Sequence, residues 1–95
     1  MARLVYSEQA VLDLERLCDF LIETNPVTAA ETIQLITTAV EILDRHPYVG
    51  RLLDGELREL IISRGSSGYV ALYSFEEVDD AILILAIRHQ REVGY

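Results

Sequence analysis

The chain has 95 residues, and 51% of them are hydrophobic. This length predicts a single domain, residues 1–95, with one modest core and some apolar surface left for a partner. The formal net charge is −8, and all eight basic residues are arginines. Because binding to a phosphate backbone needs a clustered positive field, this charge argues against non-specific binding to nucleic acid.

The sequence contains no sign of a membrane or secreted protein. No apolar run is long enough to cross a bilayer, and the first residues lack the long apolar core of a secretory signal. The single cysteine, Cys18, excludes an internal disulfide and is typical of a reducing cytosol. Cys18 falls on a helical apolar stripe, so we expect a buried thiol. The expected location is therefore cytoplasmic, without membrane contact.

The first elements along the chain are a short strand and an amphipathic helix. Residues 2–6 are expected to form the strand. Ser7 is a favourable helix N-cap, and after it the apolar residues recur at spacings of three and four. This periodicity predicts a helix over residues 8–24 with one apolar face.

A second helix follows almost directly. Asn25 is a good cap, and Pro26 fits the first position of a helix, so the pair ends one helix and begins the next. The second helix is expected over residues 26–46, because the residue before Pro47 avoids helical geometry. His46 is expected to contact the carbonyls at its C-terminal end. Two helices with so short a connection predict an antiparallel hairpin.

The second half of the chain predicts a sheet. Residues 47–56 are expected to be a loop, and strands are expected over 57–64, 69–75 and 81–88. The last is a continuous apolar run, which is typical of a strand buried on both faces. The fold class is therefore α+β, in which a helical hairpin packs on one face of a small antiparallel sheet, in the order β-α-α-β-β-β.

Polar residues at the strand ends are the candidate site. Five basic side chains are placed to converge on one side of the sheet: Arg58, Arg64, Arg88, His89 and Arg91. Converging arginines suit a phosphate or carboxylate, because each guanidinium offers a planar fork of donors. The alternative is that they solubilise the strand ends and pair with nearby glutamates. Tyr48, Tyr69 and Tyr73 are interpreted as packing residues.

Signatures of catalysis are weak. His89 is the one histidine in a plausible site, and histidine can act as a general acid or base near neutral pH. No committed nucleophile or acid stands beside it, so a non-catalytic role is the stronger interpretation. The sequence has no glycine-rich phosphate loop, no Cys/His metal spacing and no recognisable Ser-His-Asp pattern. We therefore expect no cofactor and no metal.

Four large apolar residues fall off the core-facing stripes of the helices. They are Leu12, Phe20, Leu35 and Ile42. One interpretation is that they are scattered surface residues or widen the core face. The other is a contact strip for a partner helix or for a second copy of the chain. The acidic helices favour a partner segment that carries basic residues between apolar anchors.

The order of several short sequences resembles the RelE/ParE superfamily of bacterial toxins. These sequences are NP at 25–26, HPYVGR at 46–51, LREL at 57–60, YVALY at 69–73 and ILAIRHQR at 84–91. The resemblance covers about residues 3–91. It implies the toxin half of a type II toxin–antitoxin pair, whose protein partner is a cognate antitoxin that folds on binding.

The resemblance implies two activities. RelE-like members cleave mRNA in the ribosomal A site, whereas ParE-like members inhibit DNA gyrase and have no known catalytic site. The residues that match a RelE-like site are Arg58 and Arg64 on the sheet, Arg88, His89 and Arg91 at the last strand, and Tyr95 near the terminus. The acidic total and the lack of lysine favour the ParE-like branch, because a ribosomal RNA partner demands a basic protein. We expect a gyrase inhibitor rather than an enzyme. The alternatives are a ribosome-dependent mRNA endonuclease and a degenerate module that only binds its antitoxin.

Overall fold

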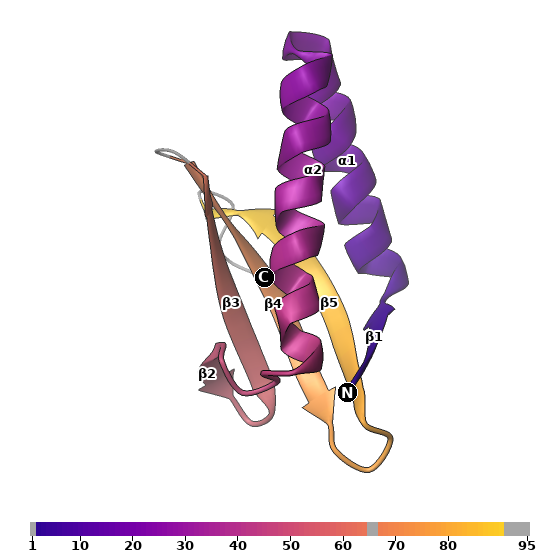
Figure 1. Ribbon diagram of the computed structural model, residues 1–95, viewed down its shortest axis with the longest axis vertical. Helices are drawn as coiled ribbons and strands as arrows, with labels where there is room; N and C mark the ends of the chain where they lie inside the picture. The colour runs from indigo at the N-terminus through magenta and orange to yellow at the C-terminus, as the bar shows by residue number, and fades with distance from the viewer. Residues whose placement is uncertain (1, 65–66, 91–95) are drawn as a thin grey trace.

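A computed structural model describes residues 2–64 and 67–90 of the chain. The elements are β1 (Arg3–Tyr6), α1 (Glu8–Thr24), α2 (Pro26–Glu41), the short 3₁₀ helix η1 (Ile42–Asp44), β2 (Arg51–Asp54), β3 (Leu57–Arg64), β4 (Ser67–Glu76) and β5 (Ala81–His89). Helices α1 and α2 form a hairpin over one face of a five-stranded sheet (Figure 1). The expected α+β architecture is confirmed.

Caps written in the sequence explain where the helices begin and end. Ser7 has an extended backbone, and its Oγ accepts a hydrogen bond from the Ala10 N–H at 3.0 Å. Asn25 closes α1 with its backbone N–H and opens α2 with its side chain, which accepts from the N–H groups of Val27 and Thr28. One residue therefore serves both helices, which allows the hairpin to turn within a single position.

The second helix is shorter than expected. Helix α2 ends at Glu41, and the chain tightens into η1 instead of remaining α-helical to residue 46. A 3₁₀ turn is common at a helix C-terminus, and here it carries the fully buried Leu43 into the core. His46 contacts the end of the helix through its backbone N–H, which donates to the Ile42 carbonyl at 3.0 Å.

The sheet has the strand order β1-β5-β4-β3-β2. Strand β1 runs parallel to β5, and the other neighbouring strands are antiparallel. The expectation of an unbroken loop over residues 47–56 is wrong, because β2 pairs with β3 as a short hairpin. Gly55 allows the turn, since its φ of 56° lies in the left-handed region that glycine adopts readily. All four residues of β2 are exposed, so burial left no alternating pattern in the sequence.

The core lies between the hairpin and the sheet. Ile36 and Val40 of α2 and Leu43 of η1 pack against strand residues that include Tyr73 and Ile84, all of them fully buried. Fully burying a side chain of this size contributes about 1.5–3 kcal/mol to stability. Strand β5 lies between β1 and β4, as its apolar run predicted. Cys18, expected in the core, is only partly buried.

A buried carboxylate ties α1 to β5. Asp13 is 1% exposed. Its Oδ2 accepts the Ile87 N–H at 3.0 Å, and its Oδ1 accepts from Nε2 of Gln9 at 2.9 Å. Two arginines lie nearby, with Arg16 Nη1 at 3.7 Å from Oδ1 and Arg88 Nε at 3.9 Å from Oδ2. The charge is therefore compensated on both oxygens, as a buried carboxylate requires.

Asp13 also closes a sheet edge. Strand β1 pairs only with Ala81–Ile84, so the rest of β5 continues past the end of β1. There Ser7 Oγ donates to the Leu85 carbonyl at 3.1 Å, and the Asp13 carboxylate accepts the Ile87 N–H. An uncovered strand edge is a template for pairing with another chain. At this part of the β5 edge, the side chains of Ser7 and Asp13 form the hydrogen bonds that a neighbouring strand would otherwise form.

Replacing Asp13 with alanine leaves the buried Ile87 N–H without its acceptor. We expect Asp13→Ala to lower the free energy of unfolding by about 1–3 kcal/mol. Asp13→Asn keeps an acceptor oxygen, so its loss should be smaller. Asp19→Ala, on the exposed side of the same helix, is the control and should stay within about 0.5 kcal/mol of the wild type. Urea unfolding followed by circular dichroism measures all three. Equal stability of the two alanine variants would contradict the role of Asp13.

Candidate functional site

The candidate basic residues do not form one cluster. Arg58 lies opposite Tyr73 near the start of β3, whereas His89 lies opposite Tyr69 at the end of β5. Tyr69 also pairs with Ile62, four residues along β3 from Arg58. At about 3.3 Å per residue, Arg58 is roughly 13 Å from the row that holds His89. The predicted convergence is therefore wrong for Arg58, because the register of β3 places it at the other end of the sheet.

Other candidates lie at the His89 end. The backbone of Arg64 pairs with Ser67 there, and Arg88 adjoins His89. The His89 ring packs edge-on against Tyr69 with 5.3 Å between ring centroids, and Arg88 reaches across the sheet edge toward Asp13. Successive residues of a strand point to opposite faces, so Arg88 and His89 diverge. Arg91 and Tyr95 lie outside the described residues, and their roles stay predictions.

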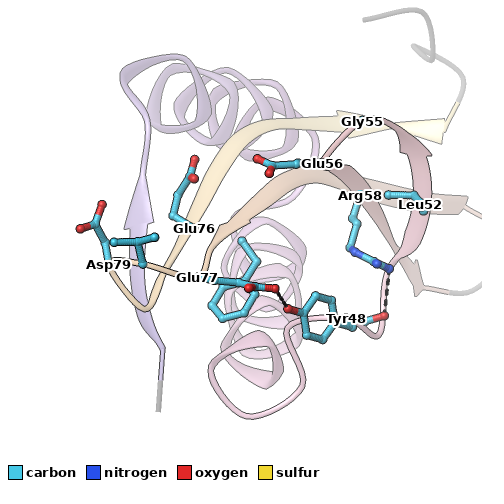
Figure 2. A pocket seen from close by; sticks show the side chains of 10 residues that line it. Tyr48, Leu52, Gly55, Glu56, Arg58, Glu76, Glu77 and Asp79 are labelled. Carbon is cyan, nitrogen blue, oxygen red and sulfur yellow. Dashed lines mark hydrogen bonds between the residues drawn. The ribbon is translucent and has the colours of Figure 1, made fainter.

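The opposite end of the sheet holds a pocket of about 400 Å³. The loop before β2, the β2–β3 turn and the β4–β5 turn surround it (Figure 2). Its charged lining consists of Arg58 and four carboxylates, namely Glu56, Glu76, Glu77 and Asp79. Four acids around one arginine make the pocket negative, so it would repel a phosphate.

Arg58 braces the loop that precedes β2. Its Nη1 donates to the carbonyls of Gly50 at 2.9 Å and Tyr48 at 3.2 Å, and its guanidinium carbon lies 5.0 Å from the centre of the Tyr48 ring. The Tyr48 hydroxyl donates to the Glu77 carboxylate (Figure 2). The Tyr48 ring packs edge-on against Phe75. The bond to Glu77 raises the pKa of Tyr48. These contacts give Arg58 and Tyr48 structural roles, as the packing interpretation of Tyr48 predicted.

Tyr73 anchors the same loop from inside the core. Its hydroxyl accepts the Gly50 N–H at 2.9 Å and donates to the Pro47 carbonyl at 2.8 Å. A Cβ on Gly50 would lie 2.6 Å from that hydroxyl, so only glycine allows the loop to approach this closely. Burial raises the pKa of Tyr73, and the Gly50 hydrogen bond and the Arg58 charge oppose that rise.

Two turn sequences could have indicated this pocket, although the sequence analysis did not use them together. Asp54-Gly55 is a hairpin turn sequence, and residues 76–80 are an acidic turn. In neighbouring antiparallel strands, the start of β3 and the end of β4 lie at one end of the sheet, so the two turns must meet. Within the described residues, no three His, Cys, Asp or Glu side chains are grouped to hold a metal ion. No described helix is long and apolar enough to span a membrane.

The apolar residues predicted to contact a partner divide into two groups. Leu12, Phe20 and Ile42 are exposed on the hairpin, with Phe20 at 68%. Leu35 is partly buried and packs against the core, so most of its side chain is already used. The exposed group remains available as a contact surface.

Comparison with known proteins identifies the family. A sequence profile described as the ParE toxin of the type II toxin–antitoxin system parDE matches residues 4–94. The chain belongs to the ParE toxin family. This confirms the resemblance to the RelE/ParE superfamily on which the two expected activities rest.

Relatives of this ParE-family chain carry both superfamily names. It is 38% identical to Toxin RelE3 of Caulobacter vibrioides over 84% of its own length and 85% of that protein. It is 32% identical to Toxin RelE2 of the same organism, over 94% and 96% of the two chains. A structure of the chromosomal ParDE system from P. aeruginosa superposes with a TM-score of 0.76 at 24% identity, over 93% of this chain and 95% of that one. The last comparison shows the shared fold.

Removing the Tyr73 hydroxyl should loosen the loop before β2. We expect Tyr73→Phe to lower the free energy of unfolding by about 1–3 kcal/mol at neutral pH, because the Gly50 N–H and the Pro47 carbonyl lose their partner. Tyr48→Phe, which removes an exposed hydroxyl, is the control and should cost about 0.5 kcal/mol or less. A Tyr73→Phe variant as stable as Tyr48→Phe would contradict this role.

The same variant should change the alkaline stability profile. The folded pKa of Tyr73 is raised above its unfolded value, so its contribution is fully present below about pH 10 and is lost as the pH rises through the folded pKa. The chain contains no lysine but four other tyrosines, so the difference between the variant and the wild type isolates the contribution of Tyr73. Stability measured from neutral pH to beyond pH 10 should therefore fall less steeply for Tyr73→Phe than for the wild type.

Proposed function

We propose that this toxin inhibits DNA gyrase and does not cleave RNA. The main support is the dispersal of the described basic residues. A nuclease must bring cations and an acid–base group to one phosphate. Here Arg58 donates to loop carbonyls at one end of the sheet, while Arg88 lies beside Asp13 at the other. Inhibition of a protein target requires only an intact surface.

Charge supports the same proposal. The chain carries −8 overall, and its pocket is lined by four carboxylates. A ribosomal RNA surface would repel such a protein, whereas an acidic protein can bind a protein target through shape and local charge. We propose a cytoplasmic location, where gyrase acts.

Ribosome-dependent mRNA cleavage is the second candidate function. It is favoured by the RelE names of the two curated relatives and by the position of Arg64, Arg88 and His89 near one end of the sheet. In that mechanism Arg64 or Arg88 would hold the scissile phosphate, and His89 or Tyr95 would transfer a proton. A degenerate toxin that only binds its antitoxin is the third candidate.

We also propose a cognate antitoxin as the protein partner. The family profile describes a toxin of a toxin–antitoxin system, and the superposed P. aeruginosa structure is titled as such a system. Leu12, Phe20 and Ile42 leave large apolar groups exposed on a hairpin that also carries exposed acids. A partner helix with basic residues between apolar anchors would cover them. A second copy of the chain is the alternative occupant.

Assays of the purified protein separate the functions. We expect the wild type to inhibit gyrase supercoiling and to leave ribosome-bound mRNA intact. The His89→Ala variant should retain most of the wild-type toxicity, because gyrase inhibition does not require His89 to transfer a proton. Loss of a general acid or base typically lowers a rate by about 10²–10⁴-fold. Codon-positioned mRNA cleavage that is abolished by His89→Ala or Arg64→Ala would reverse the assignment, and activity in neither assay would favour the degenerate toxin.

Titration with the antitoxin tests the hairpin contacts. We expect Leu12→Ser, Phe20→Ser and Ile42→Ser to weaken binding by about 1–4 kcal/mol where the residue is an anchor. Leu35→Ser should act partly through stability, because Leu35 packs against the core. Val78→Ser, on the fully exposed β4–β5 turn, is the matched control. Unchanged affinity in all four hairpin variants would remove this surface from the proposal.

A further inference from the structure

Strand β2 forms one edge of the sheet. It ends the strand order, and β3 is its neighbour on one side, while no described strand pairs with it on the other (Figure 1). All four of its residues are exposed. The loop before β2 is held on the helix side of the sheet, where the core residue Tyr73 accepts the Gly50 N–H. The outer backbone groups of β2 can therefore pair with another strand.

The sequence of β2 is self-complementary. It reads Arg51-Leu52-Leu53-Asp54, with a base at one end, an acid at the other and two leucines between them. A second copy of these four residues that runs antiparallel would place each Arg51 opposite the Asp54 of the other chain, and each Leu52 opposite Leu53. Opposite charges and apolar pairs across neighbouring strands stabilise a sheet.

A β-bulge places the two charges on the same face of the sheet. Residues three apart in a regular strand point to opposite faces. In β2 the register shifts between Leu52 and Asp54, so that Arg51 pairs with Glu59 and Asp54 pairs with Leu57. Glu59 and Leu57 are two apart in β3 and therefore share a face. The bulge thus turns both charged side chains of β2 to one side, as two matching ion pairs between copies require.

Both charges are accessible to a second chain. Arg51 contacts Glu59 through Nη2, 2.6 Å from Oε1, yet 70% of the arginine side chain is exposed. A guanidinium has five N–H donors, so it can bind a second carboxylate while it holds the first. Asp54 is exposed at the other end of the strand.

We propose that β2 pairs with β2 of a second copy of the chain, antiparallel and about a twofold axis. The two five-stranded sheets would join into one continuous sheet, with both helical hairpins on the same side. Because both copies use the same edge, the pairing closes after two chains and does not propagate. A four-residue strand buries little surface, so this dimer is weak and reversible. The inference does not depend on the target of the toxin.

Other surfaces fit a second copy less well. The opposite edge strand, β1, reads Arg3-Leu4-Val5-Tyr6, and an antiparallel copy would place Arg3 opposite Tyr6 without an acid. Two hairpins would bring their exposed acids together. The total of −8 opposes any association, but at physiological salt the Debye length is about 8 Å, so distant charges are screened more than pairs in contact.

Sedimentation of the full chain at physiological salt tests the dimer. We expect the wild type to be a monomer at micromolar concentration and to become increasingly dimeric toward millimolar concentration. Hydrogen exchange locates the contact. The amides of β2 should become more protected as the concentration rises, whereas the amides of α1 and α2 should exchange at an unchanged rate.

Exchanging the charges assigns the contact to Arg51 and Asp54. Asp54→Arg places two arginines opposite each other, and Arg51→Asp places two aspartates opposite each other. Each variant should raise the dissociation constant of the dimer about tenfold or more. An equimolar mixture of the two variants, one of them labelled, brings opposite charges together again and should restore a dimer of mixed composition.

Asp19→Arg is the matched control. It lies on the exposed side of α1 and changes the net charge by the same amount as Asp54→Arg. It should change the dissociation constant about twofold or less. Both variants make the chain less negative, so a loss of dimer that is confined to Asp54→Arg must come from the local contact.

Several outcomes would overturn the proposal. They are a monomer at every concentration, a dimer that Asp54→Arg does not weaken, protection confined to the helices, or two folded variants that do not associate when mixed. Circular dichroism shows whether each variant is folded. Arg51→Asp also removes the contact with Glu59, so Asp54→Arg and the exchange pattern decide the question if Arg51→Asp is unfolded.

Discussion

The hydrogen bond from the Ile87 amide to the Asp13 carboxylate determines how the two layers of the molecule fit together. A buried carboxylate is costly unless it finds donors, and an edge amide is costly unless it finds an acceptor. The Asp13 carboxylate accepts the hydrogen bond that the Ile87 amide must donate, and the two groups meet when α1 lies along β5. The hairpin follows α1, so the side of the sheet that is covered and the side that is left open both depend on this contact.

Covering one face has consequences for charge. The helical segments carry half of the sixteen acids, and residues 76–80 carry four more beside a negative pocket. Arginines are distributed among loop bracing at Arg58, ion pairing at Arg51 and the edge of β5 at Arg88. Within residues 2–64 and 67–90, these three arginines therefore lie at separate places on the sheet and do not form one cluster.

The elements that the sequence predicted well are those with local causes. Ser7, Asn25 and Pro26 carry capping chemistry that acts within a few residues, so both helix starts were predictable. The apolar run of β5 likewise indicated a strand inside the sheet. Strand β2 escaped prediction because its residues are all exposed and its pairing partner is another segment. Helix α2 ended early because the burial of Leu43 favours a tighter turn before Pro47.

The sequence by itself determined the fold class, the family resemblance, the acidity and the residue types available for a site. Tertiary structure alone decided which of those residues meet. Register placed Arg58 and His89 at opposite ends of the sheet, and no local pattern records register across three strands. The packing of α1 on the sheet also buries Asp13, which the sequence shows only as one acid of a helix, and makes it the link between the two layers. Contacts between distant segments depend on how whole elements pack. The chemistry of single residues decides only which contacts are favourable once packing has brought the residues together.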